Sequence, residues 1–476
     1  MASETITIHT KQDIIDYVNE RKTTKRTSLL LIIVLGTVFL DAYDLTILGT
    51  ATDQLTQEFK LSPTYLSFIM TAMPFGALFG AAIGGFYADK LGRKLILSVS
   101  LISLIIGAIG AALSPAPAIL LCFRLLMGFA IGMDSPVAFT FIAEISNKKD
   151  KGRNVNYWQV VWYIAVVSSA LIVILLYSLG TGAWLWRYSV ALGAVFATII
   201  LVLRLFYLSE SPSWSMKNKT LTEASKELEK NYNINVNIEP NKGEDESFSK
   251  TEVKNPLRTL FNKRYRKRTI LATSIATLQG MQYYAIGLYI PLIAIYIIGE
   301  NKIESLSGTA LINIAGIIGG LTGALLTTKY GARKLTIAGF SIVGTAMIII
   351  GLFYGHTYTW LIALMVAFFL FGHSGGPGTQ GKAIAALSYP TILRGKGTGF
   401  VESVSRFGSM FGTFIFPIIL ANLGLNKTML LLALVPIVGL ILLLILNGNQ
   451  SVKMSNTKIN ILKKFNTKSK SLGRLK

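Results

Sequence analysis

Residues 76–113 read GALFGAAIGGFYADKLGRKLILSVSLISLIIGAIGAAL, a charged turn between two long apolar blocks. The charged residues of this stretch lie between Asp89 and Lys94. A block of about 20 apolar residues can cross the ~30 Å hydrocarbon core of a bilayer as a helix. The stretch therefore predicts two membrane helices joined by a short polar turn.

Similar blocks recur along the chain of 476 residues, of which 52% are hydrophobic and only 15% charged. Soluble domains rarely have this composition. The predicted membrane helices are 28–50, 65–88, 95–113, 117–142, 157–180, 185–208, 269–298, 306–327, 333–354, 358–386, 396–420 and 428–447. The shortest turns between them are 114–116, 180–182 and 422–427, and merging one pair would leave eleven helices. The fold class is thus an all-α polytopic membrane protein with twelve transmembrane helices.

One long polar stretch divides the predicted helices into two groups of six, an arrangement typical of transporters built from two similar halves. Within this stretch we expect an amphipathic helix at 220–230 and a mobile segment at 231–254. The predicted domains are an N-terminal cytoplasmic segment 1–27, a first half 28–208, a linker 209–268, a second half 269–447 and a basic tail 448–476.

Basic residues gather in alternate loops, and Lys and Arg beside a membrane helix are retained in the cytoplasm. This predicts a multi-pass protein of the cell membrane with both termini cytoplasmic. The net charge of +22 lies mainly in these loops and the tail, so we expect contact with anionic lipids rather than with nucleic acid. The basic loop residues are Arg21, Lys22, Lys25, Arg26, Lys90, Arg93, Lys94, Lys148, Lys149, Lys151, Arg153, Arg333, Lys334, Arg394 and Lys396.

Catalytic motifs are absent from the sequence. It has no cluster of metal ligands, no G-x-x-x-x-G-K-[ST] phosphate loop and no nucleophile motif, and its lone cysteine, Cys122, cannot form an internal disulfide. We therefore expect no enzyme activity, no cofactor and no metal. Transport would be driven by an ion gradient rather than by ATP hydrolysis.

The turn Gly85-Phe-Tyr-Ala-Asp89-Lys90-Leu-Gly92-Arg93-Lys94 resembles the G-x-x-x-D-[RK]-x-G-[RK]-[RK] signature of the major facilitator superfamily. In that family the turn latches the two halves together on the cytoplasmic side. The resemblance therefore implies a gating role for Gly85, Asp89, Gly92 and Arg93. The matching turn of the second half keeps Gly331 but has Thr328 in place of the acid, so we expect an asymmetric latch.

The fourth predicted helix carries Arg124-x-x-x-Gly128-x-x-x-Gly132-x-Asp134-x-Pro136, followed by Glu144. Gly128 and Gly132 form a smooth face that another helix can approach closely. The spacing, together with Ser209-Glu210-Ser211-Pro212-Ser213-Trp214 after the sixth helix, resembles the branch of sugar porters, phosphate symporters and organic-acid symporters. It adds Arg124 and Glu144 to the predicted gating residues.

Acidic residues inside the predicted helices are candidate proton-coupling groups, because an ionisable side chain in the bilayer is costly unless it faces a cavity or a partner. Asp41-Ala-Tyr-Asp44-Leu and Gly132-Met-Asp134-Ser-Pro136 resemble segments of phosphate symporters. Asp41 and Asp44 share a helix face. The alternative for each acid, including Asp134, is a structural ion pair, for example with Arg124 or Arg406.

The second half argues against two substrate classes. Phosphate symporters would have Asp and Tyr where this chain has Gln282 and Ile286, and Gly376-Pro377-Gly378 replaces their G-P-N. Sugar porters would have two adjacent glutamines where this chain has Leu278-Gln279. The sequence keeps closer likeness to the organic-acid and metabolite symporters of the same branch.

Arg406 in the eleventh helix is the predicted carboxylate clamp, since guanidinium binds planar anions in bidentate fashion. The alternative is that Glu402, four residues earlier, neutralises it. The other predicted substrate contacts are polar or aromatic residues that could line a cavity, namely Gln159, Trp162, Gln279, Gln282, Tyr283 and His373. We expect a proton-coupled, monomeric symporter of a small organic acid working by alternating access. The alternatives are a sugar or phosphate symporter and a solute sensor that does not transport.

Overall fold

The computed structural model describes residues 5–50, 52–239, 255–291, 293–294 and 301–446. Its apolar segments are helical, because a helix pairs its backbone amides internally where water is absent. Within these residues, ten helical stretches are long and apolar enough to cross a membrane. The first half consists of α2 (Lys25–Thr50), α4 (Pro63–Leu91), α5 (Arg93–Ala112), α6 (Pro117–Ile145), α7 (Lys151–Ser178) and α8 (Leu185–Tyr207), with the short α3 (Thr52–Phe59) after α2.

The second half repeats the six passes with two interruptions. Its helices are α12 (Arg266–Ile286), α14 (Lys302–Tyr330), α15 (Ala332–Phe353), α16 (Thr359–His373), α17 (Thr379–Ser388), α18 (Thr391–Leu432) and α19 (Leu434–Ile445). A π-helical segment, Ser374–Gly378, joins α16 to α17, and Gly376 within it has a non-helical backbone. Gly424 (φ 70°, ψ 172°) interrupts α18, so the predicted turn at 422–427 is confirmed. Together the halves form the predicted all-α twelve-helix fold.

Helices α4 and α6 touch along their backbones. A Cβ atom on Gly128 would lie 2.1 Å from the carbonyl oxygen of Met73, and one on Gly132 would lie 2.3 Å from that of Ala77. Neither position can therefore carry a side chain at this separation. The predicted smooth face on the fourth helix is confirmed.

The two turns that the sequence matched between the halves have the same backbone. Gly92 (φ 102°) ends α4 and Gly331 (φ 78°) ends α14, each in the left-handed region that glycine adopts at little cost. After each of these two glycines the chain enters the next helix directly, α5 at Arg93 and α15 at Ala332. The repeat predicted from sequence is thus a repeat of local structure.

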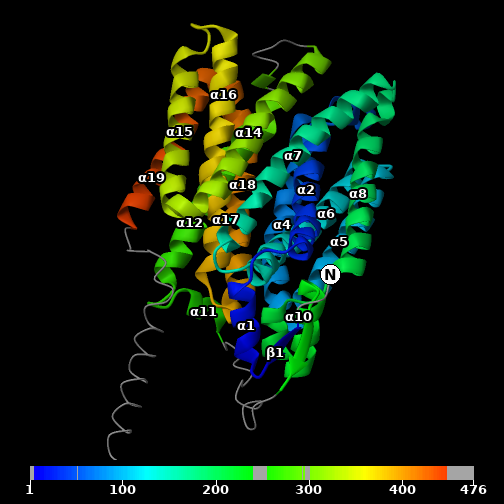
Figure 1. Ribbon diagram of the computed structural model, residues 1–476. Coiled ribbons are helices and arrows are strands. Elements are labelled where there is room, and N and C mark those ends of the chain that lie inside the picture. Colours follow the sequence, from blue (N-terminus) through cyan, green and yellow to red (C-terminus); the bar gives the residue numbers. More distant parts are fainter. Residues whose placement is uncertain (1–4, 51, 240–254, 292, 295–300, 447–476) are drawn as a thin grey trace, which may run out of the picture.

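A small folded unit lies below the helices in Figure 1, built from the N-terminal segment and the linker. Strands β1 (Thr5–Ile8) and β2 (Asn235–Ile238) pair in parallel, and α1 (Lys11–Glu20), α9 (Pro212–Asn218) and α10 (Leu221–Tyr232) cover them. Its apolar core contains Ile8, Ile14, Val18, Met216, Leu221, Leu228 and Tyr232. We call this end of the molecule, which also carries α11 (Pro256–Leu260), the linker end.

The small unit bears on two expectations about the linker. The predicted amphipathic helix is confirmed as α10. The prediction of a mobile segment from residue 231 is wrong for 231–239, because Asn231 and Tyr232 are buried residues in the last turn of α10 and β2 follows. Residues 240–254 and the basic tail 448–476 lie outside the described residues.

The halves stand side by side and meet along two helix pairs (Figure 1). Helix α4 packs against α18, where Ser403 donates a hydrogen bond of 2.8 Å to the carbonyl of Leu78. Helix α7 packs against α14, where Asn156 donates one of 2.7 Å to the hydroxyl of Thr327.

Candidate functional site

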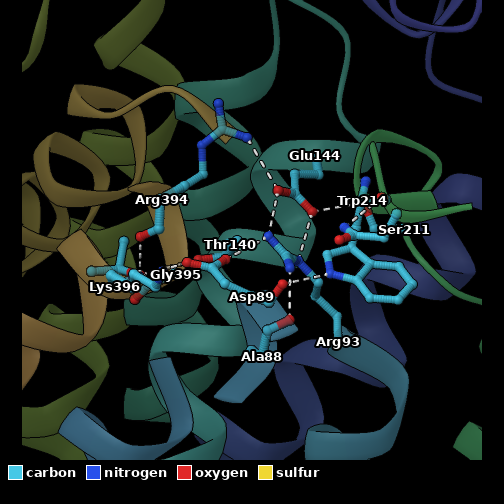
Figure 2. A network of polar contacts seen from close by, with 12 residues as sticks. Ala88, Asp89, Arg93, Thr140, Glu144, Ser211, Trp214, Arg394, Gly395 and Lys396 are labelled. Carbon is cyan, nitrogen blue, oxygen red and sulfur yellow. Dashed lines mark hydrogen bonds and ion pairs between the residues drawn. The ribbon is translucent and has the colours of Figure 1, made fainter. Parts of the chain in front are cut away.

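Arg93 is the centre of a polar network at the linker end, drawn in Figure 2. Its guanidinium donates two hydrogen bonds of 3.0 Å to the Glu144 carboxylate, one of 3.0 Å to Asp89 and one of 2.7 Å to the carbonyl of Ala88. Arg93 and Glu144 are 1% exposed. Such bidentate, charge-assisted pairs are among the strongest hydrogen bonds in proteins.

The same network crosses from one half to the other (Figure 2). The backbone amide of Lys396 donates a hydrogen bond of 3.1 Å to Asp89, and Arg394 lies 3.6 Å from Glu144. Gly85 makes the approach possible, because a Cβ there would lie 2.4 Å from the carbonyl oxygen of Gly395. The linker end of the interface between the halves is therefore closed.

The linker contributes three residues to this network. Ser211 donates a hydrogen bond of 2.6 Å to Glu144, and the Trp214 indole donates one of 3.0 Å to the carbonyl of Asp89. Glu210 accepts from the backbone amides of Arg93 (2.9 Å) and Lys94 (3.1 Å), the first residues of α5. It thus caps a helix that has no capping side chain of its own. Burial raises the pKa of Glu210, despite the backbone amides that stabilise its charged form.

A second charged cluster lies between the halves, away from the linker end. Arg406 of α18 pairs with Asp41 of α2 at 3.4 Å, and both side chains are 5% exposed. Arg406 also donates a hydrogen bond of 3.1 Å to the hydroxyl of Tyr284. The buried Nε of Arg406 has no hydrogen-bond partner within the described residues. A guanidinium at the interface therefore keeps a donor free.

One helical turn from Arg406, Glu402 pairs with Lys382 of α17 at 3.1 Å. The Lys382 ammonium lies 4.3 Å from the ring centre of Trp158 and 4.8 Å from that of Phe139, both in the first half. A cation against two aromatic faces is attracted by their quadrupoles. The direct ion pair of Glu402 is thus with Lys382, and that of Arg406 is with Asp41 of the other half.

An aromatic and amide layer adjoins these pairs. The Trp162 indole donates a hydrogen bond of 2.7 Å to the hydroxyl of Tyr283, whose ring stacks on His373 with centres 5.0 Å apart. Gln282 lies 2.9 Å from the His373 Nδ1 atom, while its own Oε1 atom has no hydrogen-bond partner within the described residues. Residues predicted to contact the substrate thus meet here from three helices, α7, α12 and α16.

The remaining predicted amides are buried in different surroundings. Gln159 lies beside the π-helical segment, where a Cβ on Gly378 would be 3.1 Å from its Nε2 atom. Gln279 donates a hydrogen bond of 3.1 Å to the carbonyl of Ala276 on its own helix. Gln159 thus borders the aromatic layer, whereas the recorded bond of Gln279 is local.

Asp44 and Arg124 form a third buried group, within the first half. Arg124 donates a hydrogen bond of 2.8 Å to the backbone carbonyl of Asp44. The carboxylate oxygens of Asp44 have no hydrogen-bond partner among the described residues, and neither do two nitrogens of Arg124. Arg124 is thus beside Asp44 and is not part of the linker-end network with which the sequence grouped it.

Asp134 belongs to a fourth group, also inside the first half. Its Oδ2 atom lies 2.6 Å from Arg204 of α8 and accepts a hydrogen bond of 2.7 Å from Ser100. Arg204 also donates to the carbonyl of Leu97 at 2.7 Å and to the hydroxyl of Thr37. The ion pair expected as an alternative for Asp134 exists, but with Arg204 in place of Arg124 or Arg406.

Sequence reasoning missed four charged residues of these clusters. Arg204 and Lys382 lie within predicted membrane helices. A charge there is costly, and this cost could have marked both residues as candidates from the sequence. Arg394 was interpreted as a loop cation, and Glu210 as part of a family motif without a structural role. Their partners are 20 to 250 residues away in sequence and lie on other helices or loops, so no local pattern encodes such pairs.

Two six-helix halves, charge pairs between them and an ionic network at one end define a transmembrane transporter of the major facilitator type, which is not an enzyme. The profile of the family described as "Sugar (and other) transporter" matches residues 29–458, and the chain belongs to this family.

Relatives within the family differ in what their names say they carry. The chain is 28% identical to the "Putative metabolite transport protein YaaU" of Escherichia coli, over 86% of this chain and 88% of that protein. It is 24% identical to the "Gallate transporter" of Pseudomonas putida, over 93% and 96%. A solved structure of the proton:xylose symporter XylE, from Escherichia coli, superposes with a TM-score of 0.73 at 17% identity, over 87% and 94%.

Proposed function

We propose that this protein is a proton-coupled symporter of a small organic acid. The observation that carries the proposal is the buried pair between Arg406 and Asp41, one from each half. Guanidinium binds a carboxylate through two parallel hydrogen bonds, so a carboxylate solute can replace Asp41 at Arg406. The free Nε donor of Arg406 favours this exchange.

The same exchange couples transport to protons. A solute carboxylate at Arg406 leaves Asp41 without its cation, and an ionised carboxylate buried alone costs several kcal/mol. Taking up a proton removes this cost, so one proton would accompany each carboxylate. Asp44, whose carboxylate oxygens have no hydrogen-bond partner among the described residues, is the second coupling candidate. Asp134 is retained as a third, although its pair with Arg204 gives it a structural role as well.

The linker-end network is proposed as the gate. Gly85, Asp89 and Glu144 contact the second half there, and Arg394 joins them from that half. Arg93 holds the two acids in place, and Gly92 forms the turn that leads into Arg93. Opening this end requires the Asp89 and Glu144 contacts across the interface to break. We place the linker end in the cytoplasm of the cell, with basic loops against anionic lipids. One chain is sufficient for this mechanism.

The name of the gallate transporter supports an acid as substrate. A sugar is the second candidate, because the family and the XylE likeness include sugar carriers and because Gln159, Gln279 and Gln282 are buried near the interface. Sugars need several amide donors and acceptors, whereas the charged pairs described here have no role in binding a neutral solute. The balance of charges favours the acid.

The test is uptake into proteoliposomes with an imposed pH gradient, using radiolabelled organic acids, sugars and phosphate. We expect gradient-driven accumulation of an acid, and loss of it in Arg406→Gln. Arg264→Gln, an exposed residue at the linker end, is the matched control. Accumulation of a sugar but of no acid would overturn the substrate class, and binding without accumulation would identify a sensor.

A further inference from the structure

Lys382 and Glu402 are a charge pair that binding of a single carboxylate at Arg406 does not use. Both are buried, at 8% and 2% exposure. They lie at the same interface as Arg406, since Glu402 precedes it by one helical turn and the Lys382 ammonium contacts rings of the first half. Asp41 interacts electrostatically with both of them as well as with Arg406. The four charges form one group.

Within the described residues, this second pair has unused bonding capacity. Glu402 Oε2 lies 3.1 Å from the Lys382 ammonium, yet it accepts no well-directed hydrogen bond. The ammonium has three N–H donors, and its ion pair with Glu402 is the one it makes at ion-pair distance in the described part of the chain. The nearby Trp158 indole nitrogen also has no hydrogen-bond partner among the residues that the structure describes. Buried polar groups are normally hydrogen-bonded. The unpaired atoms gathered around this pair therefore offer sites for the polar atoms of a ligand.

We infer that Lys382 is a second anion subsite and that the substrate is a short dicarboxylate, held between Lys382 and Arg406. This inference rests on the proposed organic-acid function and deepens it. Glu402 and Arg406 are four residues apart on α18, so their Cβ atoms lie about 5–6 Å apart, and Lys382 is paired with Glu402. The Lys382 ammonium is therefore held about one helical turn from Arg406, a spacing that suits a small diacid.

A cationic or zwitterionic substrate fits this group less well. The faces of Phe139 and Trp158 that would attract an organic ammonium already hold the Lys382 ammonium. A second positive group placed there would be repelled by Lys382 and by Arg406. Lys382 and Arg406 therefore disfavour binding of a cationic substrate and favour binding of a second carboxylate.

The charges also define a proton balance. Without substrate, Asp41 and Glu402 neutralise Arg406 and Lys382, so the group has no net charge. A dicarboxylate adds two negative charges and displaces both protein carboxylates, which then take up one proton each. Two protons would accompany each dianion, and this step moves no net charge into the site.

The experiment compares matched pairs of acids in proteoliposomes with an imposed pH gradient. Malonate, succinate and glutarate are set against propionate, butyrate and valerate. We expect the diacids to be taken up with a specificity constant at least tenfold higher than that of the monoacids. The imposed pH gradient at which a fixed opposing diacid gradient gives no net flux should correspond to two protons per diacid, and the flux should not respond to membrane potential because this exchange moves no net charge.

Lys382→Gln combined with Glu402→Gln removes both charges and leaves no buried ion unpaired. We expect the preference for diacids to fall at least tenfold in this double variant and the proton ratio to approach one. Size-exclusion profiles and tryptophan fluorescence check that the variant is folded, and Lys382→Arg should keep part of the preference. A monoacid carried equally well, with an unchanged ratio in the double variant, would overturn this inference but leave the organic-acid function standing. No acid uptake at all would overturn both.

Discussion

Replacing Asp134 by Asn tests whether its buried pair is structural. The substitution keeps the size of the side chain but removes its charge, and it leaves Arg204 as a fully buried cation. Breaking a buried ion pair from one side costs about 3–5 kcal/mol. Arg204 keeps hydrogen bonds to the carbonyls of Leu97 and Val34, so we expect the lower end, about 3 kcal/mol.

Removing both charges should cost much less. In Asp134→Leu combined with Arg204→Met no buried charge is left, and apolar side chains of similar volume replace the pair. Substitutions of this kind are often neutral or stabilising. The double variant should therefore recover most of the stability that Asp134→Asn loses.

The assay is the apparent melting temperature in detergent, measured with gradient-driven uptake per folded molecule. We expect Asp134→Asn to lower the melting temperature by on the order of 5 °C and to retain a dependence on the pH gradient. The exposed Glu20→Gln serves as control. An Asp134→Asn protein that melts like the parent but no longer responds to the gradient would refute this reasoning and make Asp134 a coupling residue.

Three further predictions concern the stability of the fold. Burial raises the pKa of Glu210, so the folded protein keeps that proton to higher pH than the unfolded chain, and stability should decline as pH rises from 4.5. Glu210→Gln should remove this part of the decline in melting curves between pH 4 and 8. Gly128→Ala places a Cβ 2.1 Å from Met73 and should cost about 1–3 kcal/mol, whereas Gly344→Ala, with 3.6 Å to Pro436, should melt like the parent. Val18→Asp puts a charge into the apolar core of the small unit, so limited proteolysis should cut residues 5–24 faster while the membrane helices stay intact.

Much of the helical fold could be predicted from local sequence. Apolar blocks of about twenty residues allow only helices in a bilayer, because other backbone conformations leave amides unpaired there. Gly128 and Gly132 on one helix face predicted a close contact, and the structure has it against α4. The small unit at the linker end was not predicted, since its parallel strands join residues 5–8 to 235–238 and such pairing has no local signal.

For the candidate sites too, one part could be predicted from the sequence and the other part could not. The sequence by itself determined that Asp41, Asp44, Asp134 and Arg406 are buried charges, because hydropathy places them inside membrane helices. Only the tertiary structure decided the partners. Asp41 faces Arg406 across the interface, Asp134 faces Arg204 within the first half, and Lys382 takes Glu402. Helix packing selects these pairs, and the spacing of residues along one helix carries no information about which neighbouring helix each side chain meets.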